Sequence, residues 1–392
     1  MTIKKALLGV LIPLAMQAES LDSLLNKVER SPLYKSRVES LKAQLQSDKA
    51  GLLNDAWRVS GDLAYADLKD GSDSGTEYAV TLGKDFNLGG SNLEKLFRES
   101  ENYTKMRETI ERNRLRARLW YLYRSYCLTM KALQAKGELG VVYDEMSRHI
   151  DKGVRFGEFD ASKSIMAHLA LENLNLQIAE LDSKLQEYEA QIEAIVPFDG
   201  QFECHMARPD IEAFFDPENS ALWPMLHTGV FRAKEGIAVA SNRTPSVGVD
   251  GTYTDEIDTR RYTLSLSLPL SFGAKNDAER AAAMHTYEAA RAELEAFKNR
   301  YAQDTRALKK RLDIYFNHVS KTEASIRLSS DTLIDQSRMR FKAGEASFLD
   351  MLKAAETKLQ MIETILTLKT SRLDAVYNYL DRYAVDPQGV LK

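Results

Sequence analysis

The chain has 392 residues, of which 44% are hydrophobic and 28% are charged, and its formal net charge is −4. This composition excludes a disordered chain, and the slight acidic excess argues against a nucleic-acid binder, which is normally basic. Only nine prolines and twenty glycines interrupt the sequence, which favours long helices.

The segment 1–18 has the pattern of a secretory signal peptide. Lys4 and Lys5 precede an apolar run that ends at Met16, and Ala18 is a small residue suited to the last position before cleavage. We therefore expect an exported chain; the alternative is a short buried N-terminal helix. No later segment reaches the roughly 20 consecutive apolar residues that a membrane-spanning helix needs.

Two large blocks of the chain share one plan, which indicates a duplicated unit. The block 19–195 reads as a leading helix, two strands, a long helix and a return helix, and 221–392 repeats that order. A connector rich in proline and acidic residues, 196–220, joins them. The matches that carry the repeat are Tyr78 with Tyr262, Leu82 with Leu266, and Arg155-Phe156 with Arg340-Phe341.

The strands of both blocks alternate apolar and polar residues, which predicts a sheet with one apolar and one polar face. Strands of about 10 residues are long enough to cross a bilayer when tilted. Four strands cannot close a barrel, so chains would have to share one if the apolar face meets lipid. The candidate membrane-facing residues are Tyr78, Val80, Leu82, Val247, Val249, Leu264, Leu266, Leu268 and Leu270. The alternative is a soluble protein whose hairpins pack on its own helices.

The long helices are predicted over 91–152 and 276–342, because neither segment contains proline. At 1.5 Å per residue each is about 90 Å long, far beyond an ordinary globular helix. Turns at Gly157 and Gly344 lead into return helices with apolar residues at alternating spacings of three and four, as in a coiled coil. In the first return helix these residues are Leu171, Leu174, Ile178, Leu181, Leu185, Tyr188, Ile192 and Ile195.

This ordered set resembles the TolC-like outer membrane efflux family, most clearly in "YTLSLSLPLSFGAKN" (262–276) and "RFKAGEASFLDMLKAAETKL" (340–359). The resemblance implies a mainly α fold with β hairpins, in which a homotrimer completes a twelve-stranded barrel and an α-helical tunnel. It further implies a periplasmic adaptor and an inner membrane transporter as partners, with no catalysis and no cofactor. The chain would lie in the outer membrane of a Gram-negative bacterium, as the exit duct of an efflux or type I secretion system.

The resemblance also implies two functional positions at the ends of the helical hairpins. Asp350 matches an acidic residue that narrows the family's tunnel, whereas Lys353 departs from a position that is often acidic. A ring of Asp350 carboxylates would favour cations, and the alternative is that Asp350 merely begins the return helix. The expected adaptor-docking residues are Gly157, Glu158, Arg340, Phe341, Gly344 and Glu345. Drugs, metal ions, peptides and proteins all remain candidate cargoes.

No catalytic or metal-binding motif is found. Cys127 and Cys204 are the only cysteines, and we expect two isolated thiols, with a bridge as the alternative. His205 beside Cys204 could contribute ligands for a soft metal ion, but the sequence has no second pair of ligand residues at a matching spacing. The arginine-rich segment 111–124 is expected to form a solvated or intersubunit helix face rather than a nucleic-acid surface. The functional alternative to a channel is a soluble periplasmic coiled-coil scaffold.

Overall fold

The computed structural model describes residues 19–53, 57–66, 75–88, 90–198, 202–204, 216–241, 246–268 and 274–390. They form two compact units, each of which draws on both halves of the sequence. The sheet unit comprises the described parts of 36–111 and 217–302, and the hairpin unit comprises the described parts of 1–35, 112–216 and 303–392. The predicted signal peptide lies outside the described residues, and the block boundaries at 195 and 221 stay a prediction.

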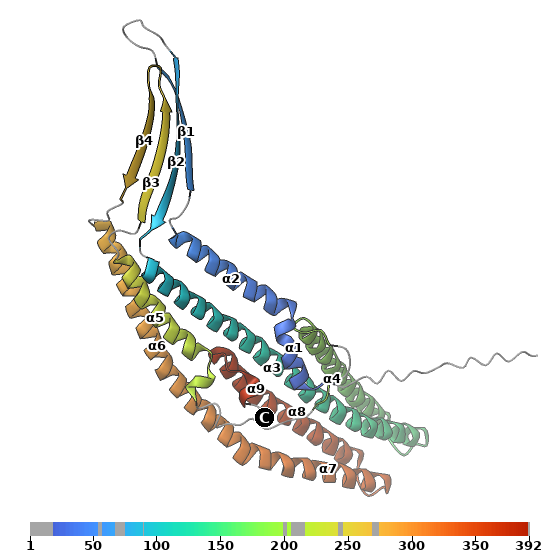
Figure 1. The fold of residues 1–392 in the computed structure, drawn as a ribbon. Coiled ribbons are helices and arrows are strands. Elements are labelled where there is room, and N and C mark those ends of the chain that lie inside the picture. The colour runs from blue at the N-terminus through green and yellow to red at the C-terminus, as the bar shows by residue number, and fades with distance from the viewer. Residues whose placement is uncertain are drawn as a thin grey trace, which may run out of the picture. The chain divides into compact units, whose positions relative to one another are not determined.

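The sheet unit contains an antiparallel sheet with strand order β1-β2-β3-β4 (Figure 1). Its strands are β1 (Trp57–Ala66), β2 (Gly75–Asn87), β3 (Ser246–Asp255) and β4 (Arg260–Ser267). The two predicted hairpins are therefore joined edge to edge through β2 and β3. Helix α2 (Pro32–Leu52) precedes β1, and α5 (Leu222–Ala240) precedes β3.

The predicted alternation of the strands gives the sheet two different faces. In register, Val59 lies opposite Leu82, and Leu82 lies opposite Gly251. Apolar side chains consequently share one face across all four strands, while serine, threonine and most of the charged residues share the other. Every side chain of β4 is exposed, on both faces of the sheet.

The hairpin unit is built from long helices. Helix α3 (Gly90–Arg155) passes through both units and returns as α4 (Ala161–Glu193). Helix α6 (Ala274–Ile314) likewise has residues in both units. It continues through one π-helical turn, η4 (Tyr315–Val319), into α7 (Ser320–Lys342), which returns as α8 (Phe348–Tyr383). Shorter elements complete the described chain: α1 (Leu21–Lys27), η1 (Val28–Arg30), η3 (Pro217–Asn219) and α9 (Pro387–Val390). Within these residues, no helix is both long and apolar enough to cross a membrane.

The heptad residues of the return helices form the inner side of the hairpins. Leu174, Leu181, Leu185 and Ile192 of α4 are buried. Leu174 belongs to a core formed at the turn end by α3, α4, α7 and α8, whereas Ile192 joins a second core with α1 and α3. The spacing of three and four residues therefore predicted the buried side of α4 correctly.

Cys127 and Cys204 form a disulfide, so the expectation of two isolated thiols is wrong. Phe202 packs edge-on against Tyr123 and Tyr126 of α3, with ring centroids 5.7 and 4.7 Å apart, and this brings the connector to Cys127. The bridge joins residues 77 apart in sequence, which no local pattern signals. A bridged Cys204 has no thiolate to offer a metal, and His205 lies outside the described residues.

The arginine-rich segment of α3 also differs from expectation. Arg116 is buried rather than on a solvated face, and it forms ion pairs with Glu29 (3.2 Å) and Asp386 (2.6 Å). Asn113 donates a hydrogen bond to the carbonyl of Ala384. This face of α3 therefore holds η1 (Val28–Arg30) and the C-terminal segment within the hairpin unit.

Candidate functional site

Both helical hairpins reverse direction through the same backbone turn. Gly157 (φ 72°) and Gly344 (φ 74°) have left-handed backbones at the ends of α3 and α7. In the first turn, the N–H of Glu158 donates to the carbonyl of Gly153 and that of Gly157 donates to Val154. In the second, Glu345 donates to Arg340 and Gly344 to Phe341. These are two Schellman motifs, in which glycine avoids the strain of a positive φ.

The turns correct the predicted alignment of the repeats. Gly344 follows Gly157 by 187 residues, and the hydrogen bonds pair Gly153 with Arg340 as equivalent positions. The match of Arg155-Phe156 with Arg340-Phe341, 185 residues apart, is therefore wrong by two residues. As a result Phe156 is 80% exposed, whereas Phe341 is 6% exposed.

Asp350 lies in the first turn of α8, where it completes a capping box with Ser347. The carboxylate of Asp350 accepts hydrogen bonds from the Ser347 N–H (3.0 Å) and hydroxyl (2.7 Å), and the Asp350 N–H donates to Ser347 Oγ (3.2 Å). These bonds lower the pKa of Asp350, because they favour the ionised carboxylate. Lys353 adds a smaller electrostatic effect but forms no ion pair with Asp350. Asp350 thus begins the return helix and stays charged and exposed at the turn.

An acidic side chain joins the two hairpins just behind their turns. Glu145 of α3 accepts two hydrogen bonds from the guanidinium of Arg338 on α7, one of them from Nε at 2.9 Å. Lys342 pairs with the same carboxylate at 3.2 Å. Both cations lower the pKa of Glu145, Arg338 most strongly, so the carboxylate is ionised at neutral pH. We name these three residues the Glu145 clamp.

The space behind each turn is filled differently. A Cβ at Gly153 would lie 2.2 Å from the Phe159 ring, so the glycine makes room for that ring. At the second turn the equivalent residues are Arg340 and Ala346, a large side chain and a small one. His149 lies between the hairpins, with its ring centroid 5.0 Å from that of Phe341 and 6.1 Å from that of Phe159.

The sheet places the predicted apolar residues on one face. Val80 lies opposite Tyr253, and Val249 lies opposite Leu266. Leu264 is 82% exposed, and the other members of this face are exposed or half-buried. Leu270 lies outside the described residues. The face also contains aromatic residues that the analysis of single strands did not bring together, namely Trp57, Tyr65 and Phe86.

The polar face carries an ion-paired cluster near the end of the sheet where β2 leads into α3. Arg58 Nη2 lies 2.9 Å from Asp250 Oδ1 and 3.3 Å from Asp85 Oδ1. Gly83 and Gly248 leave room for the cluster, because a Cβ at either position would collide with its carboxylates. Farther along this face, the hydroxyls of Thr81 and Thr252 are hydrogen-bonded at 2.9 Å. Alternation placed these residues on one face, but only the strand register brings them into contact.

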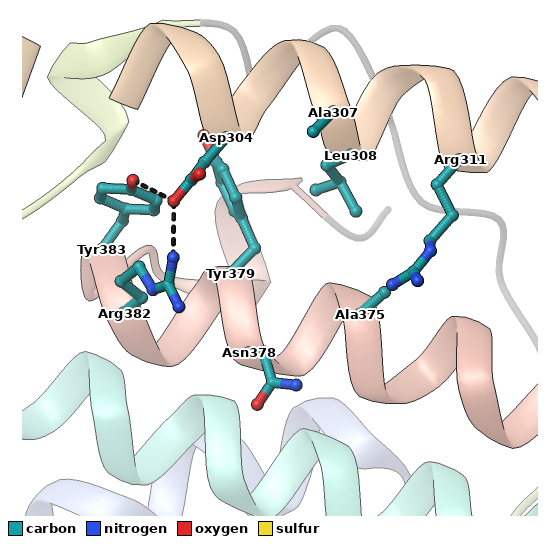
Figure 2. A pocket seen from close by; sticks show the side chains of 9 residues that line it. All are labelled: Asp304, Ala307, Leu308, Arg311, Ala375, Asn378, Tyr379, Arg382 and Tyr383. Carbon is teal, nitrogen blue, oxygen red and sulfur yellow. Dashed lines mark hydrogen bonds and ion pairs between the residues drawn. The ribbon is translucent and has the colours of Figure 1, made fainter. Parts of the chain in front are cut away.

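A cleft of about 400 Å³ lies between α6 and α8 in the hairpin unit (Figure 2). The Asp304 carboxylate accepts hydrogen bonds from the Tyr383 hydroxyl and from Arg382, both at 2.7 Å. Burial, followed by the bond to Asp304, raises the pKa of Tyr383, so the phenol keeps its proton. Arg311 extends along the cleft toward Ala375 (Figure 2). None of the lining residues is a serine, cysteine or histidine, and the arrangement braces α8 against α6.

Among the described residues, no group of three or more histidine, cysteine, aspartate or glutamate side chains is placed to hold a metal ion. The residues that sequence reasoning missed are those whose partners are distant in the chain. Glu145 and Arg338 are 193 residues apart, and Arg58 and Asp250 are 192 apart. Their only sequence signal is a charge on a predicted helix or strand face.

Comparisons with known proteins show the fold. The chain is similar to the Campylobacter jejuni CmeC outer membrane channel, at 14% identity and a TM-score of 0.71, over 95% of this chain and 86% of that one. It is also similar to the outer membrane protein VceC of Vibrio cholerae (12% identity, TM-score 0.69, 93% and 96% covered). A third is the open state of the Neisseria gonorrhoeae MtrE outer membrane channel (14% identity, TM-score 0.67, 93% and 88% covered). No family model and no curated protein matches the sequence. The fold is TolC-like, as the sequence motifs predicted.

Proposed function

We propose that this chain is the subunit of an outer membrane channel, the exit duct of a tripartite efflux or type I secretion system in a Gram-negative envelope. The observation that carries this proposal is the four-stranded sheet whose apolar face is left open. Proteins of the same fold, such as CmeC and MtrE, are outer membrane channels by description. Both are described as channels rather than as enzymes, which favours a role without catalysis for this chain.

The dimensions of the apolar face suit a bilayer. From Tyr78 to Phe86 on β2, the eight residue-to-residue steps span about 27 Å at 3.4 Å each. Outer membrane barrels have an apolar band of about 25 Å between two girdles of aromatic residues. Here Tyr78, Tyr253 and Tyr262 lie toward one end, with neighbouring ring centroids 6.0 and 5.2 Å apart, and Trp57 and Phe86 lie at the other.

In a bilayer, the free edges of the sheet would have to pair with further copies of the chain. Strands β1 and β4 are the edges, and an unpaired backbone group in lipid costs several kcal/mol. Three chains would join these edges into a closed barrel of twelve strands. The polar face, with Arg58, Asp85 and Asp250, would then line a water-filled path through which cargo passes without chemistry.

The helical hairpins would form the periplasmic tunnel, with their turns at its entrance. Glu158, Arg340, Gly344 and Glu345 are exposed there and suit contact with a periplasmic adaptor that couples the channel to an inner membrane transporter. Phe341 is buried, so its part in docking would be to support the turn. In the closed channel, Asp350 would face the narrowed entrance. Opening would separate the hairpins and break the Glu145 clamp.

Planar-bilayer conductance of the purified protein tests this function. We expect stepwise conductance with a cation preference that falls in Asp350→Asn, because the ring of charge is lost while the shape of the cap is kept. Asp182→Asn, an exposed aspartate on α4, is the matched control and should leave the preference unchanged. Unchanged selectivity in Asp350→Asn would reject the proposed role of Asp350 but not the channel function.

The absence of any pore, together with a monomer that stays soluble without detergent, would reject the channel. That result would instead support the soluble coiled-coil scaffold. The Glu145 clamp is tested in the same assay: Glu145→Gln should raise the open probability of the pore, because it removes the charge that holds Arg338 and Lys342.

A further inference from the structure

Lys84 interrupts the apolar face of the sheet. It lies on β2 directly opposite Trp57 of β1 and Val249 of β3. Its ammonium group lies 5.0 Å from the centroid of the Trp57 ring and 5.4 Å from that of the Phe86 ring. Trp57 is 63% exposed and Phe86 is 45% exposed, so the lysine and both rings form one open surface.

This ammonium has no counter-ion within the part of the chain that the structure describes. An ion pair on the same face, Asp255 with Arg260, lies at the opposite end of the sheet beside the β3–β4 turn, far from Lys84. Contact with two aromatic rings stabilises a cation but does not neutralise it. Lysine within the hydrocarbon of a bilayer is unfavourable by about 2–4 kcal/mol, and the cost nearly vanishes at the interface.

The position of Lys84 in the sheet places it at the membrane–water interface rather than in the hydrocarbon core. It lies three residues before the end of β2, and Trp57 is the first residue of β1, so both lie at the end of the sheet that adjoins the helices. Tryptophan is enriched at the level of lipid headgroups, and a lysine stem can follow apolar surface while its ammonium reaches polar groups. In a bilayer, the anionic group within reach of the ammonium at that level, in the leaflet nearer the helices, would be the phosphate of a phospholipid.

We propose that Lys84, held between Trp57 and Phe86, is a binding site for the headgroup phosphate of a membrane phospholipid. The three N–H donors of the ammonium bind the phosphate oxygens, and the two rings pack against the adjoining glycerol and acyl carbons. The site fixes the depth of the sheet in the leaflet nearer the helices. This inference rests on the proposed function, because it requires the apolar face to lie in a bilayer.

Native mass spectrometry of the full-length protein tests the site. The protein is reconstituted in phosphatidylcholine vesicles that contain a graded fraction of phosphatidylglycerol, then extracted, and the retained lipids are counted. We expect Lys84→Gln to weaken phosphatidylglycerol retention by about fivefold, the effect of one basic residue at an anionic surface. Lys84→Arg should keep most of it. Lys131→Gln, which removes an exposed lysine from α3, is the matched control and should behave as the wild type.

Flotation of the same vesicles separates the possible failures. If none of the proteins floats with the vesicles, the proposed membrane function is wrong and the lipid site falls with it. If all of them float and Lys84→Gln retains phosphatidylglycerol like the wild type, the lipid site alone is wrong. If millimolar inorganic phosphate displaces the lipid completely, the site binds free phosphate, which also overturns the proposal.

Discussion

The two hairpin turns have the same backbone but different interiors. Gly157 and Gly344 have nearly equal positive φ values and close equivalent Schellman hydrogen bonds, and a polar residue, Asp160 or Ser347, begins each return helix. Behind the first turn a glycine faces a phenylalanine ring, whereas behind the second Phe341 is packed into the core shared with α3. The turn therefore depends on a few local residues, while the packing behind it depends on which helices lie beside each hairpin.

The largest expected difference is between the two phenylalanines that the sequence alignment had paired. Phe341→Ala removes a buried ring and should lower the local stability of α7 and α8 by about 3–5 kcal/mol. Phe156→Ala removes an exposed ring and should change stability by less than about 0.5 kcal/mol. Native-state hydrogen exchange of the turn-end amides measures both. Equal losses would contradict the difference in burial between the two rings.

A second contrast concerns the equivalent residues Gly153 and Arg340 behind the two turns. Gly153→Ala places a methyl group against the Phe159 ring, an over-packing that costs about 1–3 kcal/mol, of which the better helix propensity of alanine offsets about 1. Arg340→Ala at the equivalent position should be nearly neutral. Native-state hydrogen exchange measures both variants. The double variant Gly153→Ala/Phe159→Ala should lose less stability than the sum of the losses in the two single variants. Strict additivity would mean that the ring does not meet the new methyl group.

The two turn glycines should respond alike. A Cβ at Gly157 or Gly344 meets no atom within 4 Å, so substitution by alanine costs only the strain of a left-handed backbone, about 1 kcal/mol each. Thermal unfolding in detergent and exchange at the turns should give matching losses for Gly157→Ala and Gly344→Ala. A loss at only one turn would mean that the two backbones differ in solution.

The smallest expected effect is a pH dependence that only the second turn has through Asp350. Since the folded pKa of Asp350 is lowered, its contribution is complete above the unfolded value of about 3.9 and is lost as the pH falls through the folded value. The protection of the backbone amides in the first turn of α8 against hydrogen exchange, corrected for intrinsic exchange rates, should therefore weaken in acid. Asp350→Asn should remove that dependence. A decline of the same size in the variant would assign it to another group.

Local patterns predicted the helices and the strand faces well. The absence of proline over 91–152 predicted a helix, which is observed over 90–155. A helix propagates along such a segment because no residue removes a backbone N–H donor. Alternation predicted the apolar face of the sheet, because side chains in a strand point to opposite faces in turn. The glycines at both turns were predicted because few other residues tolerate their backbone.

Long-range contacts escaped prediction. The disulfide of Cys127 with Cys204, the Glu145 clamp and the Arg58 cluster each join residues far apart in the chain. The alignment of the second turn was missed by two residues, because Arg-Phe occurs before both glycines at different distances.

The sequence by itself determined the elements and their apolar faces, since these depend on intervals of two to four residues. Only the tertiary structure decided which charges and rings meet, including Lys84 with Trp57 and Phe86. Strand register and helix packing align residues that no interval along the chain relates, and a shift of one residue in a strand would exchange the two faces.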